Sequence, residues 1–391
     1  MDIRIEPSRL SGNIAAIPSK SYAHRILTAC ALSDKPTEVQ ISVISDDIRS
    51  AIQALAALGA DIIIKQDSIV VSPIKPVAYP NINCGESGTI ARFLLPVATA
   101  LYENGTITGE GSLHNRPFKV LCDVLEKNGC QFDTKKLPIS FKGKIDFGKY
   151  EIIGNECSQY ISGLLFALPM LNGDSRIILT TPLESSGYVD MTLHVLMMFG
   201  IEVCCRHGLY EIRGRQCYKS ANSITVEGDW SNAAFWLAAD VDVTGLNQKS
   251  LQKDKLFLTV KNESEIDASD TPDLVPILSV MAAVKSNITR IYNIKRLRLK
   301  ESDRIKSTVD MLTSLGCETV ANDNEIVIVG CGKLRGGMVN GANDHRIVMA
   351  AAIASCFCEE PVNIIGAHAV NKTYPDFFKD FNILGGKAVV I

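Results

Sequence analysis

Apolar residues recur along the chain in a pattern that repeats several times. An amphipathic helix ends in an apolar residue or Asn, a glycine follows, and a strand begins. A glycine at this position supplies the left-handed backbone conformation that commonly ends a helix. The pattern predicts five helices, at residues 48–58, 120–128, 191–199, 305–315 and 377–384. Their terminal glycines are Gly59, Gly129, Gly200, Gly316 and Gly385.

A second kind of segment is apolar nearly all round, which is typical of a helix buried at the centre of a domain. Six such segments separate the amphipathic copies, at residues 21–32, 89–101, 159–168, 232–239, 274–284 and 346–356. A sixth amphipathic copy is expected between Gly200 and Gly316, but residues 250–260 there lack the terminal glycine. We interpret this stretch as a shortened unit. The chain is therefore predicted to contain six βαβ-type units, three per domain.

The length of 391 residues favours two domains, because single cores rarely grow so large. A new unit starts at residues 226–229, and the first strand, residues 1–7, can pair with the later half. We expect a discontinuous first domain of residues 1–17 and 229–391, and a second domain of residues 18–228. The functional site is expected in the cleft between these domains.

The stretch 296–300 alternates apolar and basic residues, which predicts a strand, and helical spacing begins at residue 305. Lys300, Glu301 and Arg304 therefore crowd a strand-to-helix junction. A carboxylate held between two cations beside a helix N-terminus suits the binding of an anion and the movement of a proton. The alternative interpretation is a solvated charge run on an edge strand.

Cationic side chains recur at or near other predicted helix starts. The full set is Lys20, Arg25, Arg92, Arg116, Lys300, Arg304, Arg346 and Lys372. A helix N-terminus with a nearby cation binds anions, although each start taken alone fits ordinary capping. His345 and Arg346 are unusual, because cations at this end oppose the helix dipole unless an anion lies between them. If the repeats bring these starts to one cleft, it would accept one or two small polyanions.

Other helix starts carry neutral or acidic groups. Ser158-Gln159 and Ser185 with Tyr188 offer the hydrogen bonds that a sugar-like ring requires, although simple capping explains them too. Asp273 lies on a first turn and could act as a base or be merely structural. His24 is interpreted as a structural histidine.

Composition narrows the class of protein. Apolar residues make up 46% of the chain and charged residues 21%, as in a globular enzyme. The net charge of −3 argues against nucleic acid or a membrane surface as partner. No signal-peptide pattern and no membrane-spanning run occur. The 12 cysteines are scattered without a C-x-x-C pair, so we expect no zinc site and buried thiols in a reducing cytosol. We also expect a cytoplasmic monomer that uses no metal and no cofactor.

Read together, the motifs resemble those of the EPSP synthase (3-phosphoshikimate 1-carboxyvinyltransferase) family over nearly the whole chain. They are Pro18-Ser19-Lys20-Ser21 with Arg25, Ser87-Gly88-Thr89 with Arg92, Arg116-Pro117, Ser158-Gln159, Ser185 with Tyr188, Pro272-Asp273, Leu299-Lys300-Glu301-Ser302-Asp303-Arg304, Asn343-Asp344-His345-Arg346, and Lys372-Thr373 with Pro375-Asp376. The resemblance implies an inside-out α/β barrel fold of two domains, of the enolpyruvyl transferase kind. It implies transfer of the enolpyruvyl group of phosphoenolpyruvate to the 5-hydroxyl of 3-phosphoshikimate through a tetrahedral intermediate.

The resemblance also implies residue roles by position. The expected phosphoenolpyruvate-binding residues are Lys20, Gly88, Arg116, Gln159, Arg304, Arg346 and Lys372. The expected 3-phosphoshikimate-binding residues are Lys20, Ser21, Arg25, Ser158, Gln159, Ser185, Tyr188, Asp273 and Lys300. Asp273 resembles the base on the hydroxyl and Glu301 the acid that protonates the methylene carbon, with Lys300 and Lys20 as further catalytic residues.

Three positions depart from the usual pattern of the family. Glu86 replaces an Asn beside the phosphoenolpyruvate site, Cys157 replaces a Ser near the shikimate phosphate, and Arg296 replaces an Asn near the same phosphate. Two rival functions stay open. A UDP-N-acetylglucosamine enolpyruvyl transferase would carry Lys-Asn at positions 20–21 and usually a Cys in residues 109–115. A non-catalytic anion-binding or RNA-end-binding protein would not need both acid–base carboxylates.

Overall fold

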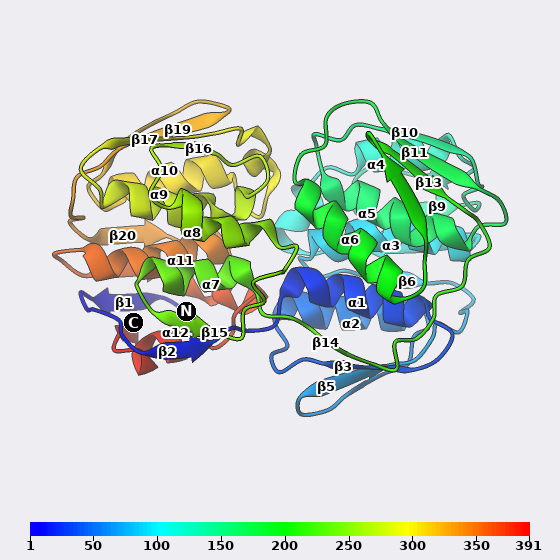
Figure 1. The fold of residues 1–391 in the computed structure, drawn as a ribbon, viewed down its shortest axis with the longest axis horizontal. Coiled ribbons are helices and arrows are strands. Elements are labelled where there is room, and N and C mark those ends of the chain that lie inside the picture. The colour runs from blue at the N-terminus through cyan, green and yellow to red at the C-terminus, as the bar shows by residue number, and fades with distance from the viewer. The chain divides into compact units, whose positions relative to one another are not determined.

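A computed structural model describes residues 1–391, and the chain divides into two compact units (Figure 1). The first unit consists of residues 1–19 and 227–391, and the second of residues 20–226. The chain leaves the first unit after Ser19 and returns to it at Glu227. These crossings lie close to the expected boundaries, after residues 17 and 228.

The second unit contains three four-stranded sheets with one common topology. In each sheet the first two strands are parallel, and the other two neighbouring pairs are antiparallel. The sheets are β14 (Ser223–Thr225), β3 (Thr37–Gln40), β5 (Ser68–Val71) and β4 (Ile62–Ile64); β6 (Asn81–Asn83), β7 (Asn104–Thr108), β9 (Ile139–Lys142) and β8 (Gln131–Phe132); and β10 (Lys149–Ile152), β11 (Ser175–Leu179), β13 (Leu209–Ile212) and β12 (Val203–Arg206).

Each sheet of the second unit is accompanied by one buried and one amphipathic helix, as the apolar pattern predicts. The buried helices are α1 (Lys20–Leu32), α3 (Gly88–Leu101) and α5 (Ser158–Ala167). The amphipathic helices are α2 (Asp46–Ala57), α4 (Lys119–Glu126) and α6 (Ser186–Met198). Within this unit the helices lie centrally and the sheets lie outside them (Figure 1). The inside-out arrangement expected from the sequence is therefore confirmed for this unit.

The first unit repeats the same topology in two of its three sheets. One sheet is β16 (Glu265–Asp267), β17 (Ile288–Tyr292), β19 (Glu325–Val329) and β18 (Glu318–Ala321), and another is β20 (Gly337–Asn340), β21 (Val362–Ile365), β1 (Ile3–Glu6) and β22 (Lys387–Val390). The first strand thus pairs with the later half of the chain, as predicted. The helices are α7 (Trp230–Ala238), α9 (Val275–Ala283), α10 (Arg304–Ser314), α11 (His345–Ala354) and α12 (Phe377–Ile383).

The third sheet of the first unit confirms the shortened repeat. It keeps only the parallel pair, β15 (Asp242–Thr244) and β2 (Asn13–Ala15). The two antiparallel strands that complete every other sheet have no counterpart here. In place of a full amphipathic helix the chain forms the short helices η3 (Lys253–Leu256) and α8 (Phe257–Val260).

The glycines that end the five amphipathic helices all have positive φ angles, between +75° and +111°. The predicted strand at residues 296–300 is wrong, because residues Lys295–Leu299 form the short 3₁₀ helix η5. Leu297 is buried whereas Leu299 is exposed, so the two leucines do not share one buried face as alternate strand residues would. None of the helices combines the length and apolar character that crossing a membrane would require.

Candidate functional site

The candidate residues form two groups, one in each unit. Asp273, Lys300, Glu301, Arg304, Arg346 and Lys372 belong to the first unit. Lys20, Ser21, Arg25, Gly88, Arg116, Ser158, Gln159, Ser185 and Tyr188 belong to the second. Most of them lie at the amino end of a helix, because each βαβ repeat places a strand-to-helix junction at the same position.

Arg304 is the centre of the group in the first unit. It is the first residue of α10, it is fully buried, and its guanidinium contacts three carboxylates. Nη2 donates to Glu301 Oε2 over 2.5 Å, Nη1 to Asp273 Oδ1 over 2.8 Å, and Nε to Asp344 Oδ2 over 2.9 Å. Burial alone opposes the charged form, but these three carboxylates together raise the pKa of Arg304.

Asp273 shows how the group converges from separate segments. It lies in the 3₁₀ turn η4 (Pro272–Leu274) that leads into buried helix α9. Its Oδ1 also accepts from Lys300 Nζ over 3.3 Å, and its Oδ2 accepts from Arg346 Nη2 over 3.1 Å. Three cations therefore surround the carboxylate expected to act as a base.

Lys300 and Lys372 complete the group. Burial lowers the pKa of the Lys300 amine, and the carboxylate of Asp273 acts in the opposite direction. Lys372 Nζ donates to the backbone carbonyl of Asn343 over 2.7 Å, just before α11 begins. Lys372 thus reaches the same helix start that carries Arg346.

Lys20 opens the group in the second unit as the first residue of α1. Its Nζ contacts Asp47 Oδ2 over 2.8 Å. His24, one turn later, lies with Nε2 3.1 Å from the Asp47 backbone carbonyl. Burial lowers the pKa of His24 to about 4, so the ring is neutral at neutral pH. This geometry agrees with a structural histidine.

Gly88 and Arg116 form a close contact, in which any larger residue at position 88 would displace the arginine. A Cβ atom added to Gly88 would lie 2.5 Å from Arg116 Nη1 and 2.7 Å from its Cζ. The guanidinium of Arg116 therefore lies directly on the backbone at the start of α3. A backbone amide end and a fixed cation at one point suit a carboxylate or phosphate group.

Gln159 is held in place by two neighbours. Its Oε1 accepts from Arg92 Nη1 over 2.8 Å, and its Nε2 donates to Thr89 Oγ1 over 2.7 Å. Arg92 is buried, and it also donates to the Pro117 carbonyl. Arg92 thus orients Gln159 beside the Gly88–Arg116 contact and links α3 to α5.

Arg25 joins the remaining residues of the second group. Its guanidinium donates to the backbone carbonyls of Ser21 and Tyr188 over 2.7 and 2.8 Å. Ser185 precedes Tyr188 as the N-cap of α6 and adopts the left-handed conformation, with φ of 55°. Burial lowers the pKa of Arg25 to about 10. The residue therefore fixes α1 against the start of α6.

The structure also shows the surroundings of Ser158 and of the three residues that depart from the family pattern. Ser158 is the first residue of α5 and is buried, and Cys157 is its N-cap without a side-chain capping bond. Glu86 lies against Gly111, where an added Cβ would meet its carboxyl carbon at 2.5 Å. Arg296 donates to the backbone carbonyl of Ser269.

Sequence reasoning missed three carboxylates. Asp344 is fully buried and accepts from Arg304 twice, yet it reads as an ordinary N-cap. Asp47 is the partner of Lys20 but lies on a different helix. Burial and the charge of Asp273 raise the pKa of Asp254 to about 7. For Asp344 and Asp47 the only sequence signal is that buried cations need counter-ions, and Asp254 has no such signal.

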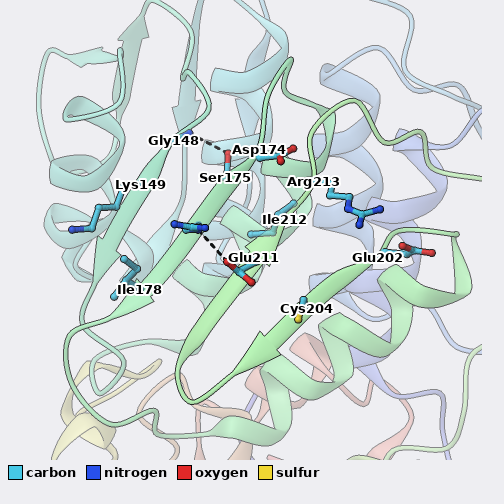
Figure 2. Close-up of a pocket in the computed structure, with 11 residues that line it drawn as sticks. Gly148, Lys149, Asp174, Ser175, Ile178, Glu202, Cys204, Glu211, Ile212 and Arg213 are labelled. Atoms are coloured by element: carbon cyan, nitrogen blue, oxygen red, sulfur yellow. Dashed lines mark hydrogen bonds and ion pairs between the residues drawn. The ribbon is translucent and has the colours of Figure 1, made fainter.

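One cavity of about 720 Å³ lies elsewhere, on the sheet formed by β10, β11, β13 and β12 (Figure 2). Arg176 and Glu211, which are paired on β11 and β13, line it and form an ion pair with Nε and Oε1 3.1 Å apart. None of the candidate residues lines it. The cavity is therefore separate from the candidate functional residues.

Each group combines fixed cations with hydrogen-bonding side chains, and the first adds carboxylates that can exchange protons. The fold and these two groups define a two-unit α/β enzyme of the kind that handles small anions. The chain belongs to the EPSP synthase (3-phosphoshikimate 1-carboxyvinyltransferase) family, whose sequence model matches residues 5–262 and 239–381. The two matches overlap at the shortened unit.

Curated relatives and solved structures agree with this membership. The chain is 38% identical over 427 residues to the 3-phosphoshikimate 1-carboxyvinyltransferase of Clostridium novyi, with 98% of each chain covered. It is 40% identical over 422 residues to that of Clostridium acetobutylicum, covering 98% of this chain and 97% of the relative. An EPSP synthase structure from Acinetobacter baumannii covers 100% of both chains at a TM-score of 0.82 and 22% identity, which supports the fold.

Proposed function

We propose that this chain transfers the enolpyruvyl group of phosphoenolpyruvate to the 5-hydroxyl of 3-phosphoshikimate, giving 5-enolpyruvylshikimate 3-phosphate and phosphate. The observation that carries the proposal is the arrangement around Arg304. One buried guanidinium holds Asp273 and Glu301, over 2.8 and 2.5 Å, and so fixes a candidate base and a candidate acid relative to each other.

The reaction needs this pair. In the addition step, Asp273 accepts the hydroxyl proton, Glu301 protonates the methylene carbon of phosphoenolpyruvate, and the hydroxyl oxygen bonds to the central carbon. In the elimination step, the Glu301 carboxylate takes a proton from the new methyl group, the C=C bond forms again, and the C–O bond to phosphate breaks so that phosphate leaves with its electron pair. Positioned acid–base groups typically contribute about 10²–10⁴-fold to the rate. The remainder must come from orientation and from charge stabilisation by the fixed cations.

The cations are assigned to the anionic parts of the substrates. We propose that Arg304, Arg346 and Lys372 bind phosphoenolpyruvate together with residues of the second unit, namely Lys20, Gly88, Arg116 and Gln159. We assign 3-phosphoshikimate to Lys20, Ser21, Arg25, Ser158, Gln159, Ser185, Tyr188, Asp273 and Lys300. Both groups would then act on one pair of substrates. We further propose that the chain acts as a monomer and that the reaction takes place in the cytoplasm.

The test is a phosphate-release assay with phosphoenolpyruvate, comparing 3-phosphoshikimate with UDP-N-acetylglucosamine as acceptor. We expect release only with 3-phosphoshikimate. Release only with the nucleotide sugar would favour the rival transferase. Binding of both anions by calorimetry without any phosphate release would favour a non-catalytic anion-binding protein.

A further inference from the structure

The short segment 250–254 of the shortened unit has inverted polarity. The polar side chains of Ser250, Gln252 and Asp254 are buried, and Gln252 is only 5% exposed. The apolar side chain of Leu251 is 40% exposed. A segment that simply covered an apolar core would bury the leucine and expose the polar residues. The polar side chains must therefore have another function in this position.

Gln252 uses the whole hydrogen-bonding capacity of its amide. Its Oε1 accepts from Ser19 Oγ over 3.2 Å and from the Trp230 backbone N–H over 3.1 Å. Its Nε2 donates to Glu227 Oε1 over 2.6 Å and to the Gly228 carbonyl over 2.8 Å. A primary amide offers two acceptor lone pairs and two donors, so all four are paired.

The partners of Gln252 mark the two places where the chain passes between units. The chain leaves the first unit after Ser19 and returns at Glu227. The two crossings are bonded to each other, since the Ser19 N–H donates to the Glu227 carbonyl over 2.8 Å. Glu227 also accepts from the side chains of Asn247 and Ser250. One glutamine thus connects both crossings to the first turn of α7.

The second crossing is tightly packed at Gly228, where there is no room for a side chain. An added Cβ at Gly228 would lie 2.7 Å from the Gly245 carbonyl oxygen and 2.9 Å from the Ala16 Cβ. Lys20 follows Ser19 directly and is the first residue of α1. The Ser19 side chain is bonded to Gln252 and its backbone N–H to the Glu227 carbonyl, so both bonds restrain the residue that precedes Lys20.

We infer that Gln252 is a positioning residue for Lys20, acting through Ser19 and Glu227. The inference rests on the proposed function, which assigns Lys20 to the substrates. A reacting group displaced by about 1 Å can lose roughly 10²-fold in rate. We therefore expect Gln252→Leu to lower kcat/KM for phosphoenolpyruvate by about 10–100-fold.

The test is a double-mutant cycle with Lys20→Met and Gln252→Leu, measured by phosphate release. If Gln252 acts through Lys20, the double variant loses much less than the product of the two single losses. Both tryptophans of the chain, Trp230 and Trp236, lie in α7, so intrinsic fluorescence reports whether α7 is intact. Gln252→Asn keeps an amide and serves in the same cycle if the leucine variant does not fold.

Gln216→Leu is the matched control. The Gln216 amide also connects two segments, accepting from the Glu202 N–H and donating to the carbonyls of Glu202 and Arg213. It lies beside no candidate residue, so kcat/KM should stay within about twofold of the original. Losses that multiply independently in the cycle, or a Gln252 variant as active as the control, would overturn the inference. An original chain without turnover would instead refute the proposed function, and the inference would fall with it.

Discussion

Replacing Asp344 by Asn tests the arrangement around Arg304. Asp344 and Arg304 have side-chain exposures of 0% and 1%, and both oxygens of Asp344 accept from the guanidinium. Asn keeps the shape and one acceptor for the Arg346 N–H, which Asp344 now binds over 3.0 Å. The new NH₂ group would, however, replace Oδ2, which now accepts from both Arg304 Nε and Ser302 Oγ.

The expected loss of unfolding free energy follows from the burial of this ion pair. Removing one partner of a buried ion pair costs about 3–5 kcal/mol. Arg304 retains Asp273 and Glu301, so we expect the lower end, about 3 kcal/mol. For a unit of roughly 150–250 residues each kcal/mol shifts Tm by about 2–4 °C, which gives a decrease of roughly 6–12 °C. Turnover should also fall, because the guanidinium that orients the acid and the base is disturbed.

The assay is thermal unfolding followed by circular dichroism, combined with phosphate release at saturating substrates. Asp310→Asn is the control, because its ion pair with Lys306 is exposed and such pairs contribute at most about 1 kcal/mol. If Asp344→Asn melted no lower than the control and kept full turnover, Asp344 would be shown not to stabilise or orient Arg304.

Three further predictions follow from the same geometry. Glu301→Gln should reduce turnover by at least about 10²-fold while calorimetry still detects both substrates, and an active variant would remove Glu301 from the mechanism. Gly88→Ala should raise KM for phosphoenolpyruvate by about tenfold or more, because its Cβ would meet Arg116 Nη1 at 2.5 Å; an unchanged KM would contradict that contact. Burial lowers the pKa of His24 to about 4 from an unfolded value of 6.5, so the folded state binds fewer protons. The stability of the chain should therefore fall by roughly 3 kcal/mol as pH decreases from 6.5 to 4. In denaturant titrations His24→Gln should flatten this slope, and an equal slope in both proteins would exclude His24 as its source.

The repeat could be read from the sequence because its signals are local. A glycine such as Gly59 or Gly316 after an amphipathic helix marks the helix end wherever the helix packs, and both have positive φ. The shortened unit at residues 250–260 was visible for the same reason, as a copy without its glycine. The candidate site residues are likewise predicted from motifs at helix starts, and their roles stay predictions.

Features that depend on partners far along the chain could not be predicted in this way. A strand is expected at residues 296–300, but the chain forms a 3₁₀ helix there. Leu297 is buried in it and Leu299 is exposed. Asp344 pairs with Arg304 across 40 residues, and Gln252 bonds to Ser19 across 233. Neither pairing leaves a periodic trace in the sequence. Both pairings form because these polar groups are buried, where water cannot serve as their hydrogen-bond partner.

We propose that residues of both units bind the same pair of substrates. The most direct measurement is the affinity for phosphoenolpyruvate, by calorimetry in saturating 3-phosphoshikimate, of Arg346→Met from the first unit and Arg116→Met from the second. Lys306→Met, an exposed cation outside both groups, is the control. We predict that Arg346→Met and Arg116→Met each weaken binding by at least about tenfold, since a hydrogen bond to a charged group contributes roughly 1.5–3 kcal/mol, and that the control does not. If only one of the two variants lost binding, the two units would not share the phosphoenolpyruvate site.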